Sequence, residues 1–266
     1  MCMSLPKEQA LKDVTLFVLD MDGTFYLSDT IIEGALEFIQ KVRDTGREFL
    51  FFTNNASRIS SFYKEKLEKM GLSVKEEDII TAGDVTIEYL KSYYPGKRVY
   101  LNGTPLLEQS FLEKGIHLCK EDPDVVVQSF DLTLTYDKLE KICTFVRNGV
   151  PFLATHMDTN CPVDYGFIPD CGAMCDLITS STGVKPKFLG KPCKETMDMI
   201  LKITGKTVDE IAFVGDRIYT DVATGVNNGA KGFLVLTGEA DMDTVAKSEV
   251  EPTCIYESLY EMSKYL

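Results

Sequence analysis

The sequence predicts an α/β protein built on a doubly wound parallel sheet, with a second α/β domain inserted into it. Three observations lead to this prediction. Strand-like and helix-like segments alternate along most of the 266 residues, which is typical of parallel sheets covered by helices. Several strand-like segments are continuously apolar, as expected for strands buried on both faces. No long Pro/Gly linker separates the segments, so a second domain must be inserted through short connections.

The first part of the chain contains two strand–helix pairs. Residues 14–20 ("VTLFVLD") are typical of a buried strand, and residues 31–46 ("IIEGALEFIQKVRDTG") have helical spacing that ends at a glycine. Residues 47–55 ("REFLFFTNN") form a second apolar strand with a polar end. A helix is expected over residues 61–71 ("SFYKEKLEKMG"), again closed by glycine.

The middle of the chain is also α/β. We expect a helix over residues 78–94, capped by Asp78, and an amphipathic helix over residues 137–149 with apolar residues at i, i+3, i+4 and i+7. Three strands are expected, over residues 98–103, 124–130 and 151–158.

The alternation then resumes toward the C-terminus. Helices are expected over residues 194–205 and 220–229, and strands over residues 210–216 and 231–238. The predicted domains are therefore a core made of residues 1–79 and 188–266, and an inserted α/β domain made of residues 80–187.

Composition excludes some classes of partner. The net charge is −13 and the pI is near 4.7, so non-specific binding to nucleic acid or to an anionic membrane is disfavoured. No segment is apolar and long enough to span a membrane, and the first residues lack the apolar core of a signal peptide. We expect a cytoplasmic protein with no nucleic-acid or membrane partner.

The eight cysteines are expected to be free thiols in that compartment. A zinc cluster of Cys161, Cys171, Cys175 and Cys193 is the minor alternative. Their spacing matches no standard zinc pattern.

Polar side chains gather where the predicted strands end. In open parallel sheets, ligands bind beyond the carboxyl ends of the strands. The candidate ligand-binding residues lie at three strand ends and at the start of one helix. They are Asp20, Asp22, Thr53, Asn54, Asn55, Lys191, Asp216 and Asp221.

Clustered carboxylates do not all stay ionised without a cation. Mg²⁺, a hard ion that prefers oxygen ligands and keeps waters or phosphate oxygens, fits such a cluster. The Lys191 ammonium and the Thr53 hydroxyl then suit a phosphate group. The two aspartates Asp20 and Asp22 suit a division between an ionised nucleophile and a proton carrier.

Four ordered motifs, "DMDGT", "TNN", "GKP" and "GDRIYTD", resemble those of the haloacid dehalogenase superfamily. The phrases "TNNASR", "ATHMDTNCP" and "GAMCDLITSSTGVKP" are similar to its NagD-like, p-nitrophenylphosphatase-like, type IIA subfamily. The resemblance extends from about Phe17 to Gly238. It implies a Rossmann-like core, a large inserted cap, and a phosphatase that acts on small phosphate monoesters such as sugar phosphates or nucleotides.

The resemblance also implies roles for individual residues. Asp20 would form an aspartyl phosphate, and Asp22 would act as general acid and then general base. Mg²⁺ would lie on the Asp20 carboxylate, the Asp22 carbonyl and Asp216, with Asp221 in support. The phosphoryl group would be held by Thr53, Lys191 and the adjoining amides Asn54 and Asn55.

Two segments depart from the subfamily pattern. Relatives often have "ATNPD" where this chain has Thr155, His156, Met157 and Asp158, and a "PG" pair where it has Pro169 and Asp170. These segments belong to the predicted cap, so we expect His156 and Asp158 to contact the substrate.

Three other functions stay open at this point. A phosphotransferase would use the same core, and a phosphonatase would need a Schiff-base lysine in the cap, for which Lys185 and Lys187 are candidates. A receiver-like module that carries phospho-aspartate as a signal would also use clustered aspartates, but it would lack the proton carrier and the cap. The expected partner is a small phosphorylated metabolite, and a homodimer is compatible with the sequence.

Overall fold

The computed structural model describes residues 6–163 and 165–266. Their contacts divide the chain into two compact units. Unit 1 contains the described residues up to Thr53, Lys64–Ile80 and Thr196–Leu266, and unit 2 contains Asn54–Tyr63 and Thr81–Glu195. This division groups residues 54–63 and 188–195 with the middle of the chain, whereas the sequence-based boundaries lie at 79/80 and 187/188.

Unit 1 is built on a six-stranded sheet of order β15-β14-β13-β1-β4-β5. Strand β1 pairs in parallel with both β13 and β4, and β14 pairs in parallel with β13 and β15. The strands are β1 (Leu16–Leu19), β4 (Glu48–Thr53), β5 (Ile79–Thr81), β13 (Ile211–Gly215), β14 (Lys231–Val235) and β15 (Cys254–Tyr256). All residues of β1 and β13 are buried, as expected at the centre of a parallel sheet.

The sheet is doubly wound, as predicted. From β1 the chain passes to β4 and β5 on one side, and later to β14 and β15 beyond β13 on the other. The strand order therefore reverses beside β1, and this position in an α/β sheet is where ligands bind.

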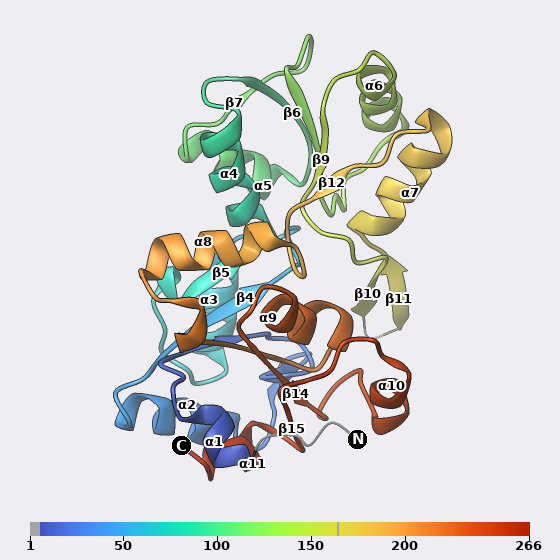
Figure 1. The fold of residues 1–266 in the computed structure, drawn as a ribbon. Coiled ribbons are helices and arrows are strands. Elements are labelled where there is room, and N and C mark those ends of the chain that lie inside the picture. The colour runs from blue at the N-terminus through green and yellow to red at the C-terminus, as the bar shows by residue number, and fades with distance from the viewer. Residues whose placement is uncertain (1–5, 164) are drawn as a thin grey trace. The chain divides into compact units, whose positions relative to one another are not determined.

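Helices of unit 1 lie beside these strands (Figure 1). Helix α2 buries Ala35, Phe38, Ile39 and Val42 on one face, which explains its amphipathic sequence. The helices with residues in unit 1 are α1 (Lys7–Leu11), α2 (Ala35–Asp44), α3 (Ser60–Lys69), α8 (Lys194–Thr204), α9 (Ala223–Asn227), α10 (Met242–Lys247) and α11 (Leu259–Ser263). Short elements are the hairpin strands β2 (Tyr26–Leu27) and β3 (Thr30–Ile31) and the 3₁₀ turns η1 (Glu76–Asp78) and η2 (Val208–Glu210).

Unit 2 has its own parallel sheet of five strands in the order β12-β9-β8-β6-β7. The strands are β6 (Arg98–Asn102), β7 (His117–Leu118), β8 (Val125–Gln128), β9 (Phe152–Ala154) and β12 (Lys187–Phe188). Its further elements are α4 (Ala82–Tyr93), α5 (Pro105–Glu113), α6 (Tyr136–Arg147), α7 (Cys171–Thr182) and the antiparallel hairpin β10 (Asn160–Val163) and β11 (Gly166–Pro169). Its core includes Val126, Phe130, Ile142 and Ile178.

The helix predicted from Asp78 begins later than expected. Asp78 ends the turn η1, the β-branched Ile79 and Ile80 form β5, and Thr81 is the N-cap of α4. The Thr81 hydroxyl accepts from the N–H of Asp84, and the Asp84 carboxylate accepts from the N–H of Thr81, a capping box that fixes this start. The Asp78 cap was therefore wrong, because β-branched residues favour a strand here.

The helix expected over residues 220–229 also begins differently. A π-helical turn, η3 (Ile218–Val222), precedes α9. π-turns are rare and often occur at functional sites.

Within the described residues, no helix is both long and apolar enough to cross a membrane.

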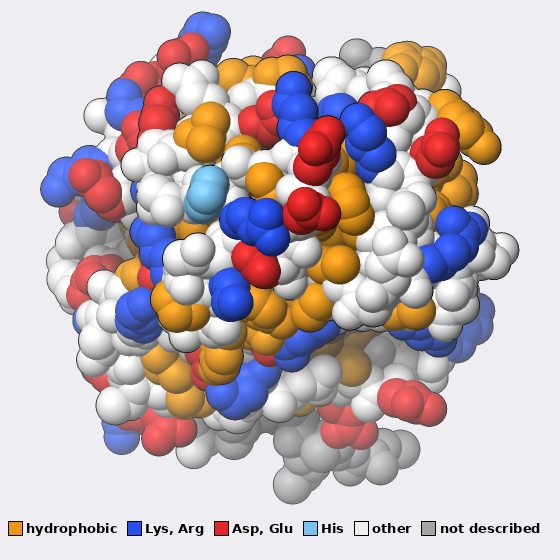
Figure 2. Space-filling model, turned by 90° about the horizontal axis from the view of Figure 1, so that it is seen from above, with side chains coloured by type: hydrophobic (Ala, Val, Ile, Leu, Met, Phe, Trp, Pro, Cys, Tyr) orange, Lys and Arg blue, Asp and Glu red, His pale blue; other side chains and the backbone are white. Residues whose placement is uncertain are grey.

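Surface charge is mixed on the face seen in Figure 2. Lysine and arginine side chains alternate there with aspartate and glutamate side chains, and the part in view has no continuous basic area. This pattern agrees with the net charge of −13.

Candidate active site

The candidate site in unit 1 is a cluster of three carboxylates, Asp20, Asp216 and Asp221, which we call the carboxylate cluster. One carboxylate oxygen from each lies within 4.8 Å of the others. Asp20 follows β1 and Asp216 follows β13, and these strands are paired neighbours. Asp221 comes from the π-turn η3. The strand pairing and the tight turn therefore bring together three acids that the sequence separates.

Asp216 is held from two sides. The Thr24 hydroxyl donates to its Oδ1 at 3.1 Å, and the N–H of Glu239 donates to its Oδ2 at 2.7 Å. Burial, followed by the charge of Asp221, raises the pKa of Asp216 to about 6. Burial and the neighbouring carboxylate thus both disfavour the ionised form of Asp216.

Gly23 is required by the close approach of the first motif to Asp216. Its φ is +88°, a left-handed conformation that glycine adopts freely, and a Cβ there would lie 2.5 Å from Asp216 Oδ2. The Thr237 hydroxyl donates to the Gly23 carbonyl at 2.7 Å and fixes the turn.

Asp22 lies in that turn, beyond β1. Although the residue is exposed to solvent, desolvation around its carboxyl group raises its pKa, against the opposing charges of Lys66 and Arg217. A carboxyl group with a raised pKa holds its proton more readily, as a general acid must.

Arg217 is a residue of this site that the sequence analysis missed. The backbone N–H of Arg217 donates to Asp221 Oδ2 at 3.1 Å. The Nε of its side chain forms an ion pair with Glu239 Oε2 at 2.9 Å. Burial lowers the pKa of Arg217, but the charges of Asp20 and Asp221 outweigh burial and raise it. The signal was available, because Arg217 stands inside the motif "GDRIYTD".

The donor set of the carboxylate cluster fits Mg²⁺. It offers only hard carboxylate oxygens, close enough together to share one ion. Burial, and then the charge of Asp221, raise the pKa of Asp216, and a bound cation would oppose both effects. Neither group of potential metal ligands found in the described residues includes a cysteine, so the zinc alternative gains no support.

A second set of predicted site residues lies in unit 2. The Asn54 side chain contacts the backbone of Lys191 at two points and the carboxylate of Asp158 at a third. Asn54 and Lys191 are both buried. The sequence analysis named all three residues but did not predict these contacts.

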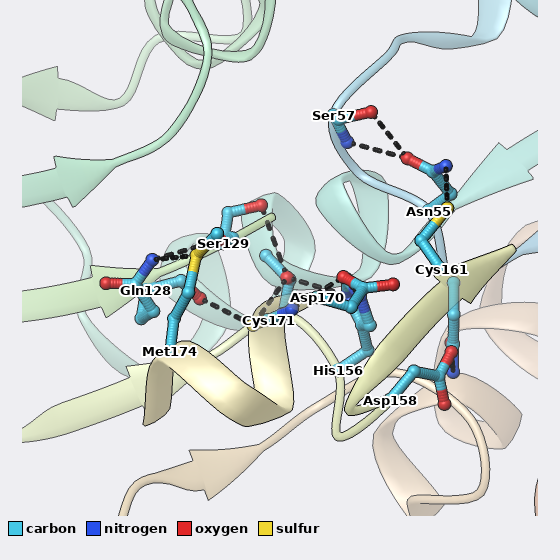
Figure 3. Close-up of polar contacts among 12 residues, drawn as sticks. Asn55, Ser57, Gln128, Ser129, His156, Asp158, Cys161, Asp170, Cys171 and Met174 are labelled. Atoms are coloured by element: carbon cyan, nitrogen blue, oxygen red, sulfur yellow. Dashed lines mark hydrogen bonds and ion pairs between the residues drawn. The ribbon is translucent and has the colours of Figure 1, made fainter. Parts of the chain in front are cut away.

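Thr53 and Asn55 flank Asn54. Thr53 ends β4 in unit 1 and is half-buried. The Asn55 side chain accepts from the N–H and hydroxyl of Ser57 at 3.0 and 2.7 Å, and its Nδ2 lies 3.9 Å from Cys161 Sγ (Figure 3).

His156 is buried and has partners on both ring nitrogens. Its Nε2 lies 2.8 Å from Asp170 Oδ1 and its Nδ1 lies 2.9 Å from Thr155 Oγ1 (Figure 3). Burial alone would lower the pKa of His156, but the charges of Asp170 and Cys171 raise it to about 10. The imidazole is therefore a cation held inside unit 2.

His156 joins Asp158 and Asp170 in a group with ligand atoms within 4.8 Å of one another, which we call the histidine cluster. His156 and Asp170 both depart from the subfamily pattern, and they form an ion pair with each other. The prediction that His156 and Asp158 contact substrate is not tested by these contacts.

The predicted site residues thus fall into two groups. Unit 1 contains Asp20, Asp22, Thr53, Asp216 and Asp221, and unit 2 contains Asn54, Asn55, His156, Asp158 and Lys191.

Comparison with known proteins identifies the family. A family model for haloacid dehalogenase-like hydrolases matches residues 17–117, and an HAD-hydrolase-like model matches residues 188–262. An acid sugar phosphatase of Staphylococcus aureus is 34% identical over 252 residues, which cover 94% of this chain and 97% of the relative. The chain belongs to the haloacid dehalogenase-like hydrolases.

Other members of the family support the same assignment. The 5′-nucleotidase YutF of Bacillus subtilis is 33% identical over 250 residues, covering 94% of this chain and 98% of that protein. The crystal structure of a 4-nitrophenylphosphatase from Thermotoga maritima has a TM-score of 0.93 and 41% identity, covering 96% of this chain and 98% of that one. The predicted NagD-like fold is thereby confirmed.

One related structure contains the expected metal. A glycerol phosphate phosphatase from Mycobacterium tuberculosis, solved in complex with magnesium, has a TM-score of 0.88 and 27% identity. The match covers 96% of this chain and 79% of that one.

Proposed function

We propose that this chain is a phosphatase that hydrolyses small phosphate monoesters through an aspartyl phosphate on Asp20. The observation that carries the proposal is the carboxylate cluster beyond the adjacent strands β1 and β13. Relatives named as an acid sugar phosphatase and a 5′-nucleotidase support sugar phosphates and nucleoside monophosphates as the substrate class.

The proposed reaction has two steps. A carboxylate oxygen of Asp20 attacks phosphorus, the ester P–O bond breaks, and Asp22 gives its proton to the departing alkoxide. Asp22, now ionised, takes a proton from water, and the resulting hydroxide attacks phosphorus, which releases inorganic phosphate and restores Asp20. The raised pKa of Asp22 supports the first of its two roles.

Mg²⁺ is the proposed cofactor. Asp20, Asp216 and the backbone carbonyl of Asp22 would hold it, with Asp221 in support. When bound, it would neutralise charge on the phosphoryl group and on the cluster. The chain's own contribution is to fix the Asp216 carboxylate through Thr24 and the N–H of Glu239. This carboxylate therefore needs little movement when the metal ion binds.

Recognition of the phosphoryl group is assigned to Thr53 and Lys191. A hydroxyl and an ammonium supply a hydrogen bond and a positive charge, the two interactions that a phosphate needs. We further propose that the inserted segment, residues 80–187, acts as a cap that selects the alcohol part of the substrate.

The phosphonatase alternative is disfavoured at Lys187. Its ammonium lies 2.6 Å from Glu195 Oε1, and the hydrogen bond to Glu195 raises the pKa of Lys187. A Schiff-base lysine needs the opposite shift, because only the neutral amine attacks a carbonyl.

The deciding experiment separates the two aspartates by leaving group. An alkoxide needs a proton as the bond breaks, whereas p-nitrophenolate does not. We therefore expect Asp22→Ala to slow hydrolysis of glycerol or sugar phosphates by about 10²- to 10⁴-fold, the usual value of general acid catalysis. Hydrolysis of p-nitrophenyl phosphate should fall much less in its first step, and a burst of p-nitrophenol should appear as phosphoenzyme accumulates.

The same measurement also tests the alternative role of Asp22. If Asp22 only supports the metal site, alkyl and aryl phosphates will slow by the same factor, Mg²⁺ affinity will fall and no burst will appear. A wild-type protein that hydrolyses none of these esters with Mg²⁺ present would overturn the proposed function itself.

A further inference from the structure

The backbone of Lys191 is held by one side chain at two points. Asn54 Oδ1 accepts from the N–H of Lys191 at 2.9 Å, and Asn54 Nδ2 donates to the carbonyl of Lys191 at 3.1 Å. A two-point contact of this kind resists rotation of the peptide units on both sides of the Lys191 Cα. The direction in which the lysine side chain leaves the backbone therefore depends on Asn54.

Asp158 and the Lys191 backbone together determine which way the Asn54 amide faces. Asn54 Nδ2 also donates to Asp158 Oδ2 at 3.2 Å. An ionised carboxylate only accepts hydrogen bonds, so the NH₂ group must face Asp158. The amide oxygen must then face the N–H of Lys191. Reversing the amide would set an oxygen against the carboxylate and an NH₂ group against an N–H.

The backbone around both residues is fixed by close contacts. The N–H of Gly172, in the first turn of α7, donates to the Asp158 carbonyl at 2.7 Å. Next to Lys191, the N–H of Gly190 donates to the Thr155 carbonyl at 2.7 Å. A Cβ at Gly190 would lie 2.7 Å from Asn54 Oδ1, so a glycine before Lys191 is what allows the amide to approach.

We propose that Asn54 and Asp158 are positioning residues for Lys191, with Asp158 acting through Asn54. The inference rests on the proposed function, in which the Lys191 ammonium binds the phosphoryl group. That group is common to every substrate. Loss of Asp158 should therefore weaken recognition of all phosphate esters by one factor, whereas a residue that selects among substrates would change their relative affinities.

The test compares Asp158→Ala with the conservative Asp158→Asn. Inorganic phosphate is the probe, with its dissociation constant measured by calorimetry on the Mg²⁺-loaded protein. For Asp158→Ala we expect that constant to rise by up to about tenfold, because a misdirected Lys191 weakens its charge-assisted hydrogen bond to the phosphate. The KM values for glycerol phosphate, a sugar phosphate and p-nitrophenyl phosphate should rise by the same factor. Asp158→Asn keeps an oxygen that can accept from Asn54, so it should recover most of the affinity.

A double-mutant cycle tests whether Asp158 acts through Asn54. Asn54→Ala should weaken phosphate binding at least as much as Asp158→Ala, and the double variant should be no worse than Asn54→Ala alone. Asp176→Ala, an exposed aspartate on α7, is the matched control and should leave phosphate binding unchanged. If an alanine variant does not fold, Asn54→Ser and Asp158→Ser provide the same cycle with smaller changes in volume.

The outcomes separate this inference from the proposed function. If the wild-type protein neither binds phosphate nor hydrolyses the esters, the proposed function fails. If the wild-type protein does both, unchanged phosphate affinity in Asp158→Ala overturns the positioning role. The positioning role would also be overturned if the losses of phosphate affinity in Asn54→Ala and Asp158→Ala add up in the double variant. Altered KM ratios among the three esters would overturn it too.

Discussion

The carboxylate cluster in unit 1 and the histidine cluster in unit 2 have similar geometry and opposite electrostatics. Each brings three ligand atoms within 4.8 Å of one another. In the first, the pKa of the buried Asp216 is raised to about 6, so its negative form is disfavoured. In the second, the pKa of His156 is raised to about 10, so its positive form is favoured.

The difference lies in where the compensating charge comes from. The histidine cluster contains its own cation, and the ion pair with Asp170 is complete without a ligand. The ligand atoms of the carboxylate cluster are all oxygens, and the neighbouring Arg217 supplies one positive charge for its three acids. A compact group of potential metal ligands is therefore a poor guide by itself. Both pKa values are raised, but the shift disfavours the charged form of Asp216 and favours the charged form of His156.

Asp20→Asn is expected to have the largest effect. It removes the attacking charge and one proposed metal ligand, so we expect turnover to fall by at least ~10³-fold with little change in stability. Steady-state kinetics on p-nitrophenyl phosphate and a thermal melt measure both. Asp44→Asn, an exposed change at the end of α2, is the control. Near-normal turnover in Asp20→Asn would end the covalent mechanism.

Asp170→Ala should produce the largest loss of stability. It leaves the His156 cation buried without its main partner and removes the N-cap of α7, where Asp170 accepts from the N–H of Cys171. We expect the broken buried pair to lower the free energy of unfolding by about 3–5 kcal/mol, which urea unfolding measures. Asp241→Ala removes only the exposed N-cap of α10 and should cost about 0.5–2 kcal/mol. Equal losses in the two variants would mean that the ion pair contributes nothing beyond the cap.

Added Mg²⁺ should stabilise the protein through the carboxylate cluster alone. At a free concentration one hundred times the dissociation constant, binding adds about 2.7 kcal/mol to the free energy of unfolding. Differential scanning fluorimetry with and without the metal measures the gain as a shift in Tm. Asp216→Asn should abolish this shift and His156→Gln should keep it. The reverse pattern would place the metal in the histidine cluster.

Per pH unit, the smallest of these effects is the pH dependence of stability that belongs to His156. Its pKa is raised from 6.5 to about 10 on folding, so its stabilising contribution is complete below pH 6.5 and is lost as the pH rises toward 10. Between these limits the wild-type free energy of unfolding should fall by up to about 1.4 kcal/mol per pH unit relative to His156→Gln. His117→Gln, at the exposed histidine of β7, should behave as wild type. Parallel curves for wild type and His156→Gln would contradict the charged imidazole.

The sequence predicted the fold because the relevant signals are local. Apolar runs mark the buried strands, and the alternation with amphipathic helices predicts the parallel sheet. The start of α4 was misplaced because the capping box of Thr81 and Asp84 overrides Asp78 as a cap, and only the pair of isoleucines before it hinted at β5.

The site was only partly predictable for a related reason. Asp20 and Asp216 could be placed together because both follow strands, and strand ends meet at one edge of a sheet. The Asn54–Asp158 contact and the His156–Asp170 pair join side chains from loops, where no periodicity relates one residue to another. The sequence marked His156 and Asp170 as departures from a family pattern, but only the structure shows that they are partners.

The discontinuity of unit 1 has a consequence for the order in which the protein matures. Asp20 directly follows β1, the second element of the chain, whereas Asp216 and Asp221 are synthesised only after all of unit 2. The strands β13 to β15, which complete one side of the central sheet, are also late. Because long-range parallel pairing is slow to form, the carboxylate cluster is assembled near the end of folding. A chain that ends before β13 contains Asp20 without the two acids that complete the cluster, so truncation within unit 2 removes the whole carboxylate cluster.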